Sequence, residues 1–499
     1  MKSYVLGTDI GTGSTKTVAV DRGGIVLCSS QVYYPTSNPQ PGYSEQDPAI
    51  ILQAFIKAIH ETVVKMGYPP VAVSLSSAMH SVLPVSENGD PLSPLILWSD
   101  ARSNAIAQEI RYSLHGASLY EATGTPIHSM SPLCKIIWIK QNLPEIFGKT
   151  FKFISIKEYI WYQLFSEFKI DYSLASATGL FHIEQLEWNP DSLSLAAITD
   201  KKLSDPVPTD YIKKGLTDRM SSLLRISADT PFCIGASDGC LANLGTHALD
   251  EGTAAITIGT SGAVRIARKQ PYRNFSMMSF NYLLDKKTYI CGGPINNGGN
   301  TVEWLLKKFL LKESVTEKEY GELFKSIEMA PAGCNGLIFL PYIHGERAPL
   351  WDQQASGAFL GIRSIHDQLH FLRAVIEGIC FALQQIVEAV EDPAHPIGEI
   401  HASGGMVHSV IWMQMLADIT GKKVCVQHTE DASATGAAYL ALLSMGMITD
   451  YAQLHKPFHI LHPRLEQHQA YQKNYALFQP LYAALRESMH GLYALTNPV

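Results

Sequence analysis

The chain has no pair of cysteines in the CxxC spacing that zinc clusters use. Its eight cysteines are scattered over the sequence, so neither a zinc cluster nor a dense disulfide framework is expected. Cysteines used in this way are typical of a reducing compartment. The sequence therefore predicts a cytoplasmic protein.

The sequence also has no long block of charges of one sign. The 39 basic and 46 acidic residues give a net charge of −7 without a long block of either sign, which argues against binding to nucleic acid. The first apolar run is interrupted at residues 7–9, too early for a signal peptide, and we expect no other stretch to approach membrane-spanning length. With 499 residues, 46% of them hydrophobic, two or more domains are expected.

Small and hydroxyl residues are concentrated near the N-terminus. The stretch YVLGTDIGTGSTKTVAVD, residues 4–21, reads as strand, tight turn and strand. It has neither the Walker A spacing nor the dinucleotide fingerprint, because no helix follows the glycines. Gly11 and Gly13 would let the backbone approach an anion, with Thr12 and Ser14 as donors. Asp9 beside a phosphate suggests Mg²⁺ between them, although the same residues also fit an ordinary hairpin.

A second copy of this strand-turn-strand motif follows about half a chain later. TAAITIGTSGAV, residues 253–264, repeats the apolar run, the Ile-Gly-Thr triplet and the return strand, with Thr257 in place of Asp9. Its loop, from Gly259 through Thr260 and Ser261 to Gly262, would be a second phosphate loop without a metal ligand. Two such hairpins in related halves are the arrangement of actin-like ATPases. We therefore expect an α/β protein with a duplicated actin-like, ribonuclease-H-like two-domain ATPase fold and a cleft between the domains.

Three further turns carry candidate residues. FCIGASDGCLANLG, residues 232–245, presents Asp238 after a strand, where it could act as a general base or simply as a turn or N-cap residue. Residues 292–310 place Gly298 and Gly299 before a helix, as a ligand contact or as a loop shaped by glycine. Residues 397–427 read as strand, Gly404-Gly405 turn, helix and strand, with the two glycines at the ligand end. Residues 371–390 predict a core helix.

These residues together resemble the FGGY carbohydrate kinases, and within that family its gluconate kinases. The segments MSPLCKIIWIKQN (130–142) and GAFLGIRSIHDQLHFLRAVIEG (357–378) are similar to the two family signatures. GASDG, TIGTSGAVR and GERAPLWD stand between them in the family's order. The resemblance covers nearly the whole chain. It implies transfer of the ATP γ-phosphoryl group to a hydroxyl of a small sugar or sugar acid, most of all D-gluconate.

The resemblance also implies roles for single residues. Asp238 matches the catalytic base, and Asp9 matches the Mg²⁺ segment. The nucleotide contacts are implied to come from the glycine-rich turns, namely Gly11, Thr12, Gly13, Ser14, Gly259, Thr260, Ser261, Gly298, Gly299, Gly404 and Gly405. The substrate contacts are implied to be Met79, His80, Asp100, Arg102 and Lys135 together with Asp238. Spacing alone does not decide which cation meets a substrate carboxylate, and His80 also fits a buried core histidine.

Two alternatives remain open at this point. Ala78 and Ser81 stand where pentulose kinases usually have glycines beside Met-His, so a pentulose kinase such as a xylulokinase is the alternative within the family. An actin-like or Hsp70-like conformational ATPase is the alternative from another class. The expected domains are 1–246, 247–445 and a mainly helical tail at 446–499 packed on the second. The sequence does not decide whether the chain acts as a homodimer.

Overall fold

The computed structural model describes residues 3–311, 317–427, 431–454 and 458–496. The chain divides into two compact units. Unit 1 comprises 1–247, 268–291 and 431–456, and unit 2 comprises 248–267, 292–430 and 457–499. The division falls at residue 247, beside the expected boundary at 246. It differs elsewhere, because 268–291 and 431–456 group with unit 1 and not with the second domain or the tail.

Unit 1 is built on a six-stranded sheet in the order β13-β14-β5-β1-β2-β3. Its elements are β1 (Tyr4–Ile10), β2 (Ser14–Asp21), β3 (Val26–Tyr33), β4 (Glu45–Gln46), α1 (Pro48–Met66), β5 (Val73–Ser77), β6 (Leu83–Val85), β7 (Leu95–Ile96), α2 (Asn104–Tyr112), α3 (Gly116–Thr123), α4 (Pro132–Asn142), α5 (Pro144–Lys149), β8 (Lys152–Ile154), α6 (Ile156–Phe165), β9 (Lys169–Asp171), α7 (Tyr172–Ser176), β10 (Phe181–His182), β11 (Glu187–Trp188), α8 (Pro190–Ala196), β12 (Asp205–Val207), β13 (Ile212–Lys213), α9 (Asp218–Leu224), β14 (Phe232–Ser237), α10 (Asp238–Gly245), β17 (Phe280–Asp285) and α15 (Ala432–Ser444).

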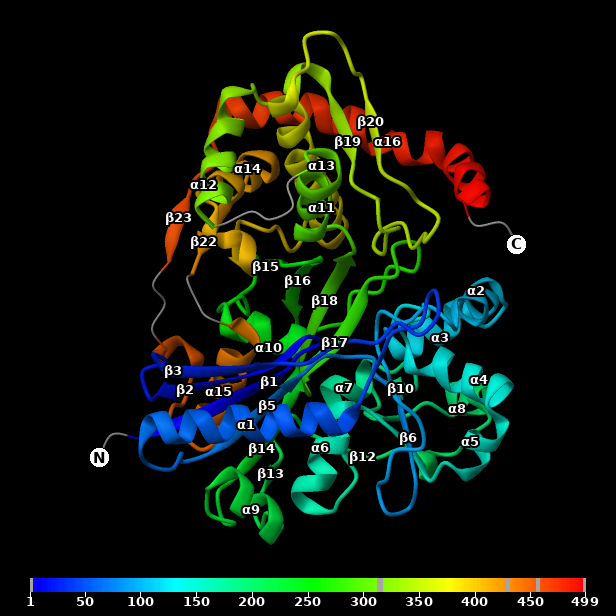
Figure 1. Cartoon of the computed structure of the whole chain (residues 1–499), viewed down its shortest axis with the longest axis vertical. Coiled ribbons are helices and arrows are strands. Elements are labelled where there is room, and N and C mark those ends of the chain that lie inside the picture. The colour runs from blue at the N-terminus through cyan, green and yellow to red at the C-terminus, as the bar shows by residue number, and fades with distance from the viewer. Residues whose placement is uncertain (1–2, 312–316, 428–430, 455–457, 497–499) are drawn as a thin grey trace. The chain divides into compact units, whose positions relative to one another are not determined.

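Helices cover both faces of this sheet (Figure 1). Helix α1 begins at the N-cap Asp47, whose side chain accepts the amide of Ala49, and it ends at Gly67 in the left-handed conformation. Its apolar face, including Ile51 and Phe55, is buried against the sheet. Helices α10 and α15 lie on the opposite face, where α15 contacts β1, β2, β5 and β14. The resulting three-layer core carries the first hairpin at one end of β1.

A seven-stranded sheet has the order β17-β18-β16-β15-β21-β22-β23. Its strands belong to unit 2, except for β17, residues 288–291 of β18 and Arg268 of β16, which belong to unit 1. The elements of unit 2 are β15 (Thr253–Ile258), β16 (Gly262–Arg268), β18 (Thr288–Ile295), α11 (Gly299–Trp304), α12 (Glu317–Ser326), β19 (Ile338–Leu340), β20 (Ala358–Leu360), α13 (Gln368–Val390), β21 (Glu399–Ser403), α14 (Val410–Thr420), β22 (Lys423–Val426), β23 (His459–Leu461) and α16 (Leu465–Thr496). The predicted strand, turn, helix and strand at 397–427 are present as β21, the Gly404-Gly405 turn, α14 and β22.

The predicted core helix at 371–390 is α13, and it is long and apolar enough to cross a membrane by length and composition alone. The expectation that no stretch approaches that length is therefore wrong for this helix. Within the described residues, 83% of its apolar window is buried inside the structure, as in the core helix of a packed domain.

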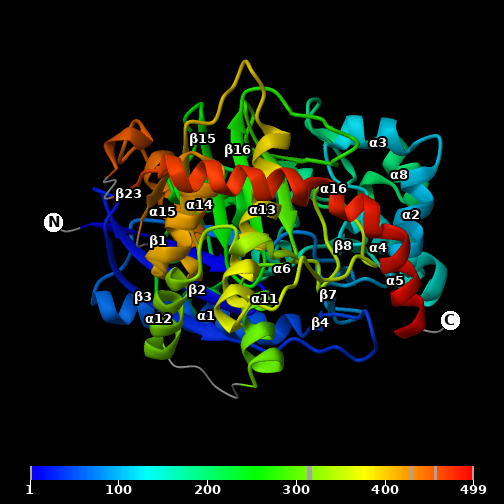
Figure 2. The ribbon, with the colours of Figure 1, turned by 90° about the horizontal axis from the view of Figure 1, so that it is seen from above.

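The long C-terminal helix α16 belongs to unit 2, where it contacts α13, α14 and β19 (Figure 2). Tyr482 Oη donates to the Asp352 carboxylate at 2.6 Å, and His490 Nε2 lies 2.6 Å from the same oxygen. Packing of a helical tail on the second half of the chain was expected. Residues 446–454, which precede α16, group with unit 1 instead.

Candidate active site

The loop of the first hairpin is held in place by side chains from other segments of unit 1. Tyr34 Oη donates to the carbonyl of Gly11 at 2.6 Å, and Gln46 Nε2 donates to the carbonyl of Thr12 at 2.6 Å. Trp98 Nε1 donates to Thr12 Oγ1 at 2.9 Å. A Cβ added to Gly13 would meet nothing within 4 Å. The loop is thus fixed from behind and open at Gly13, as a preformed anion cradle requires.

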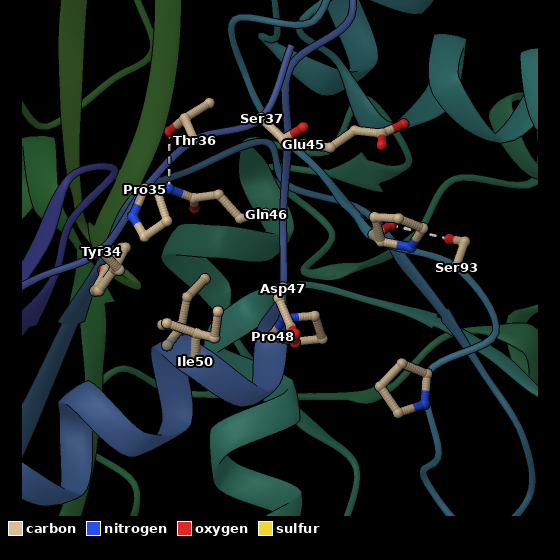
Figure 3. Close-up of a pocket in the computed structure, with 13 residues that line it drawn as sticks. Tyr34, Pro35, Thr36, Ser37, Glu45, Gln46, Asp47, Pro48, Ile50 and Ser93 are labelled. Carbon is tan, nitrogen blue, oxygen red and sulfur yellow. Dashed lines mark hydrogen bonds between the residues drawn. The ribbon is translucent and has the colours of Figure 1, made fainter. Parts of the chain in front are cut away.

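A pocket of about 460 Å³ adjoins this loop. Tyr34 and Gln46 line it together with Pro35, Thr36 and Ile50, and Figure 3 shows Gln46 reaching across to Thr36. The pocket and the loop therefore share two side chains. A change in the pocket can reach the loop through them.

Asp9, at the end of β1, lies among other carboxylates of unit 1. Ser76 Oγ donates to Asp9 Oδ1 at 2.5 Å. Burial raises the pKa of Asp9 well above its ordinary value, and the charges of Asp431 and Asp238 raise this pKa further, while Ser76 and Lys157 lower it. Carboxylates that raise one another's pKa are stabilised by a cation among them. Their oxygens are the ligands that Mg²⁺ prefers, so the residues fit this ion.

Close packing of α15 on the sheet brings Asp431 to this place. A Cβ on Gly7 would lie 1.9 Å from the carbonyl oxygen of Ala434, and one on Gly436 would lie 1.9 Å from that of Leu241. Only glycine allows such contacts between α15, β1 and α10. Asp431 caps α15 by accepting the amide of Ala434 at 2.8 Å, and so stands over β1. The sequence reasoning missed Asp431, although an Asp before an Ala/Gly-rich helix is a readable N-cap signal.

Asp238 is the first residue of α10, directly after β14. The N-cap is Ser237, which accepts the amide of Cys240, so the alternative of Asp238 as the N-cap is wrong. Asp238 Oδ1 accepts its neighbouring Gly239 amide at 2.6 Å. Behind it, buried Lys157 donates to the carbonyl of Ala236 at 3.0 Å and pairs with Asp171 at 2.7 Å. This pair fixes the end of β14, and with it the position of Asp238.

His80 has an unusual backbone conformation, with φ of 67°, and is buried. Its Nδ1 donates to the carbonyl of Ala177 at 2.7 Å, so Nε2 can accept from Tyr282 Oη at 3.2 Å. Lys135 is wholly buried and donates to the carbonyls of His80 at 2.6 Å and Met130 at 2.9 Å. Burial lowers the pKa of Lys135 to about 7, with Asp100 opposing the shift. Lys135 thus supports the strained turn of Met79 and His80.

Asp100 and Arg102 pair with each other. Arg102 Nε and Nη2 donate to the two oxygens of Asp100 at 2.8 and 2.7 Å, and Nη2 also donates to Glu45 at 2.6 Å. The guanidinium lies 3.8 Å from the ring centroid of Tyr43. Two carboxylates surround one guanidinium, so this group carries no excess positive charge.

The second hairpin, β15 and β16 of unit 2, has Thr257 at the position that matches Asp9. Thr257 Oγ1 lies 3.0 Å from Ser403 Oγ and accepts from Arg265 Nη1 at 3.0 Å. The loop is held by backbone bonds, from the Gly299 amide to the Gly259 carbonyl at 2.7 Å and from the Asn300 amide to the Thr260 carbonyl at 3.1 Å. The structure therefore brings the 259–262 loop and Gly298-Gly299 together.

The glycines of unit 2 divide into two kinds. Gly404 has φ of 93°, and a Cβ there would lie 2.4 Å from the Ile258 carbonyl oxygen; one on Gly298 would lie 2.8 Å from that of Ser261. A Cβ on Gly259 or Gly405 would meet nothing within 4 Å. Gly404 and Gly298 are needed by the fold, whereas Gly259 and Gly405 face open space that a ligand can use.

Glu346 of the GERAPLWD segment supports this region. Its carboxylate accepts from the Asn296 amide at 2.5 Å and from Asn297 Nδ2 at 3.0 Å. Burial raises the pKa of Glu346 to about 7, against these hydrogen bonds. The sequence reasoning matched this segment without giving Glu346 a role. A glutamate next to an arginine, in a segment that also holds small and apolar residues, was the available signal.

Comparison with known proteins agrees with this geometry. Models of the N-terminal and C-terminal domains of the FGGY family of carbohydrate kinases match residues 4–245 and 254–445. The chain belongs to this family of carbohydrate kinases. The resemblance inferred from the sequence is thus confirmed. As an FGGY kinase, the chain uses ATP as the phosphoryl donor that the family shares.

Individual relatives cover almost the whole FGGY kinase chain. It is 41% identical to a gluconokinase from Bacillus subtilis over 90% of this chain and 89% of that protein. It is 30% identical to a xylulose kinase from Staphylococcus epidermidis over 100% of both chains. The solved structure of gluconate kinase from Lactobacillus acidophilus matches with a TM-score of 0.92 at 31% identity, covering 99% of this chain and 100% of that one. The expected two-domain, actin-like sugar-kinase fold is confirmed.

Proposed function

We propose that this carbohydrate kinase phosphorylates D-gluconate to 6-phosphogluconate with ATP. The observation that carries the proposal is the difference between two relatives of similar length, 41% identity to a gluconokinase against 30% to a xylulose kinase. Xylulokinase activity remains the alternative within the family.

We propose Asp238 as the general base that takes the proton from the attacking hydroxyl. The position of Asp238 supports this proposal, because it directly follows the buried strand β14. Lys157 pairs with Asp171 and donates to the carbonyl of Ala236, and these contacts hold the end of that strand in place. The charge of Asp238 also acts on Asp9. General base catalysis asks for a positioned carboxylate within reach of the hydroxyl.

Asp9, with Asp431 beside it, is proposed to hold Mg²⁺. This ion, when bound, would neutralise phosphate charge during transfer. The open faces at Gly13, Gly259 and Gly405 support nucleotide contact through the backbone of these turns. Thr12, Ser14, Thr260, Ser261, Gly298 and Gly299 complete the proposed nucleotide contacts.

Met79, His80, Asp100, Arg102 and Lys135 remain the proposed substrate group. The excess of carboxylates around Arg102 argues for contact with sugar hydroxyls and not with the aldonate carboxylate. Lys135 donates to the backbone carbonyls of His80 and Met130. These bonds support an indirect role, in which Lys135 acts on the substrate by positioning His80. We propose that Lys135 sets the conformation of the Met79-His80 turn.

A substrate panel tests the proposal. D-gluconate, D-xylulose, L-ribulose, glycerol and D-glucose are compared as acceptors by kcat/KM at saturating ATP and Mg²⁺. D-gluconate should give the highest kcat/KM of the panel, because an enzyme discriminates between substrates by how well it binds each transition state. A higher kcat/KM with D-xylulose would overturn the gluconate assignment and leave the kinase assignment intact.

The rate of ATP hydrolysis without any sugar acceptor tests the alternative that the protein is a conformational ATPase. A sugar kinase should hydrolyse ATP slowly alone and turn it over when the sugar is added. ATP turnover that ignores every acceptor would favour the alternative.

We further propose a cytoplasmic location. None of the eight cysteines forms a disulfide in the described part of the chain, which supports a reducing compartment. Sedimentation of the purified chain would decide between a monomer and a homodimer.

A further inference from the structure

A cluster of three metal-ligating side chains lies in unit 2, on the strands β21 and β22. Glu399, His401 and Cys425 each offer one ligand atom, and these atoms all lie within 4.8 Å of one another. His401 Nε2 is 3.2 Å from Glu399 Oε1. None of the three belongs to the residues proposed for catalysis or substrate binding.

The sheet itself produces this cluster. Glu399 and His401 are two residues apart on β21, so their side chains leave the same face of the sheet. His401 is paired in register with Cys425 on the parallel strand β22. Neighbouring residues of a regular ladder share a face, which puts the thiol beside the imidazole. The donor set is therefore fixed by backbone that the fold already orders.

The three ligand residues differ in their exposure to solvent. His401 is 5% exposed and Cys425 is 3% exposed, and the His401 ring contacts that of Phe458 with a centroid distance of 4.6 Å. The Glu399 side chain is 39% exposed. An ion can thus enter from the glutamate side and meet two ligands that are sheltered from water.

We propose that Glu399, His401 and Cys425 form a binding site for a transition-metal dication, with Zn²⁺ as the best fit. A thiolate, an imidazole and a carboxylate are the ligand types of Zn²⁺, and three protein ligands leave one position for water. Hard Mg²⁺ disfavours a thiolate ligand, so this site is chemically distinct from the carboxylates around Asp9.

The three ligand atoms would have to move only slightly closer together to bind an ion. Tetrahedral Zn²⁺ with ordinary bond lengths sets such donors about 3.4–3.6 Å apart. Binding releases the thiol proton to solvent, leaves the imidazole neutral with its remaining ring proton on the unligated nitrogen, and uses the carboxylate as the anion it already is. The two negative ligands then balance the charge of the ion.

The position on β21 gives the site a consequence for unit 2. His401 lies three residues before Gly404, and Ser403 on the same strand contacts Thr257 of the second hairpin. A bound ion would tie β21 to β22 directly behind the Gly404-Gly405 turn. We expect the ion to raise the melting temperature of the protein, because it binds the folded state.

The experiment uses the full-length chain, freed of any affinity tag and stripped with a chelator. Co²⁺ is titrated into the protein in millimolar Mg²⁺, and the thiolate-to-cobalt absorption band is recorded; Zn²⁺ is then added to displace it. We expect one Co²⁺ per chain with Kd at or below about 1 µM, and displacement by Zn²⁺. Absence of a stoichiometric thiolate band would overturn the site.

Variants identify the ligands. Cys425→Ser and His401→Gln should each weaken binding by at least about 10–100-fold, since losing a ligand costs no less than losing its hydrogen-bond partner. His459→Gln is the matched control, because exposed His459 on β23 pairs with Val426 and so leaves the other face. Cys28→Ser, in unit 1, is the control for other thiols.

The variant Lys423→Ala tests the site without removing a ligand, so its result does not depend on whether the ligand variants fold. Lys423 is exposed and pairs in register with Glu399, so removing its charge should tighten metal binding. Wild-type affinity in Cys425→Ser, or equal loss in His459→Gln, would overturn the assignment. Circular dichroism of every variant confirms that the fold is intact.

Discussion

The two hairpins of this carbohydrate kinase share a backbone pattern and differ in charge. In the first, Asp9 on β1 pairs in register with Ser76 of β5; in the second, Thr257 on β15 pairs with Ser403 of β21. The first position carries a carboxylate among carboxylates, whereas the second carries a hydroxyl that accepts from Arg265. The hairpin thus occurs twice, with a carboxylate at this position in the first copy and a hydroxyl in the second.

The loops are also held differently. The first has four residues between Ile10 and Thr15 and is braced by the side chains of Tyr34, Gln46 and Trp98. The second has three residues between Ile258 and Gly262 and is braced by backbone amides. Side-chain substitutions can therefore disturb the first loop selectively. A repeated sequence therefore predicts a repeated hairpin, whereas the charge and the support of each loop depend on residues outside the repeat.

Asp238→Asn should have the largest effect, because Asp238 is the proposed general base. The rate of transfer at saturating substrates should fall by about 10²–10⁴-fold, the usual share of general base catalysis. ATP binding, measured by calorimetry, should stay near that of the wild type. A loss within about threefold, which is well under 1 kcal/mol of barrier, would remove Asp238 from this role.

Asp9→Asn should come next, with Thr257→Val as its matched control in the second hairpin. The Mg²⁺ concentration for half-maximal rate should rise about tenfold or more in Asp9→Asn, equal to about 1.4 kcal/mol of lost ion binding. Thr257→Val should leave it unchanged. Equal shifts in the two variants would mean that the charge difference between the hairpins has no role in metal binding.

Glycine substitutions compare the open positions of both loops. Gly13→Ala and Gly259→Ala introduce a Cβ into free space, so thermal stability should change by less than about 0.5 kcal/mol. The KM for ATP should rise about tenfold in each if phosphates occupy that space. Gly404→Ala should behave in the opposite way and lower stability by about 1–3 kcal/mol, because its φ is positive and its Cβ would strike a carbonyl. Unchanged KM in both open-loop variants would contradict phosphate contact there.

The smallest effect concerns stability and pH without Mg²⁺. The pKa of Asp9 is raised by burial and by neighbouring carboxylates, so the folded protein holds its proton at a pH where the unfolded chain has lost it. Stability should then fall as pH rises above the ordinary aspartate pKa, until the raised pKa is passed. Asp9→Asn should remove this fall and raise the melting temperature at pH 7, by about 1 °C for each kcal/mol relieved in a chain of 499 residues.

The measurement is a pair of melting curves, one near pH 7 and one below the ordinary pKa of aspartate, where wild type and variant should coincide. Added Mg²⁺ should narrow the gap at pH 7. A variant less stable than wild type at pH 7 would show that the hydrogen bond from Ser76 outweighs the repulsion.

Much of the fold could be predicted from residues close together in the chain. The first hairpin, the strand before Asp238, the helix at 371–390 and the turn at Gly404 are local patterns of apolar period and glycine. The grouping of α15 with unit 1 could not be predicted in this way. It depends on Gly7 and Gly436, which allow backbones more than 190 residues apart in sequence to touch.

The sequence by itself determined the family, the two hairpins and the residue types that phosphoryl transfer needs, because these depend on local order and composition. Only the tertiary structure decided which charges meet. It placed Asp431 with Asp9, paired Arg102 with two carboxylates, enclosed Lys135 in carbonyl oxygens and set Cys425 beside His401. Burial and register control these encounters, and both arise from contacts between segments distant in the chain, which no local pattern records.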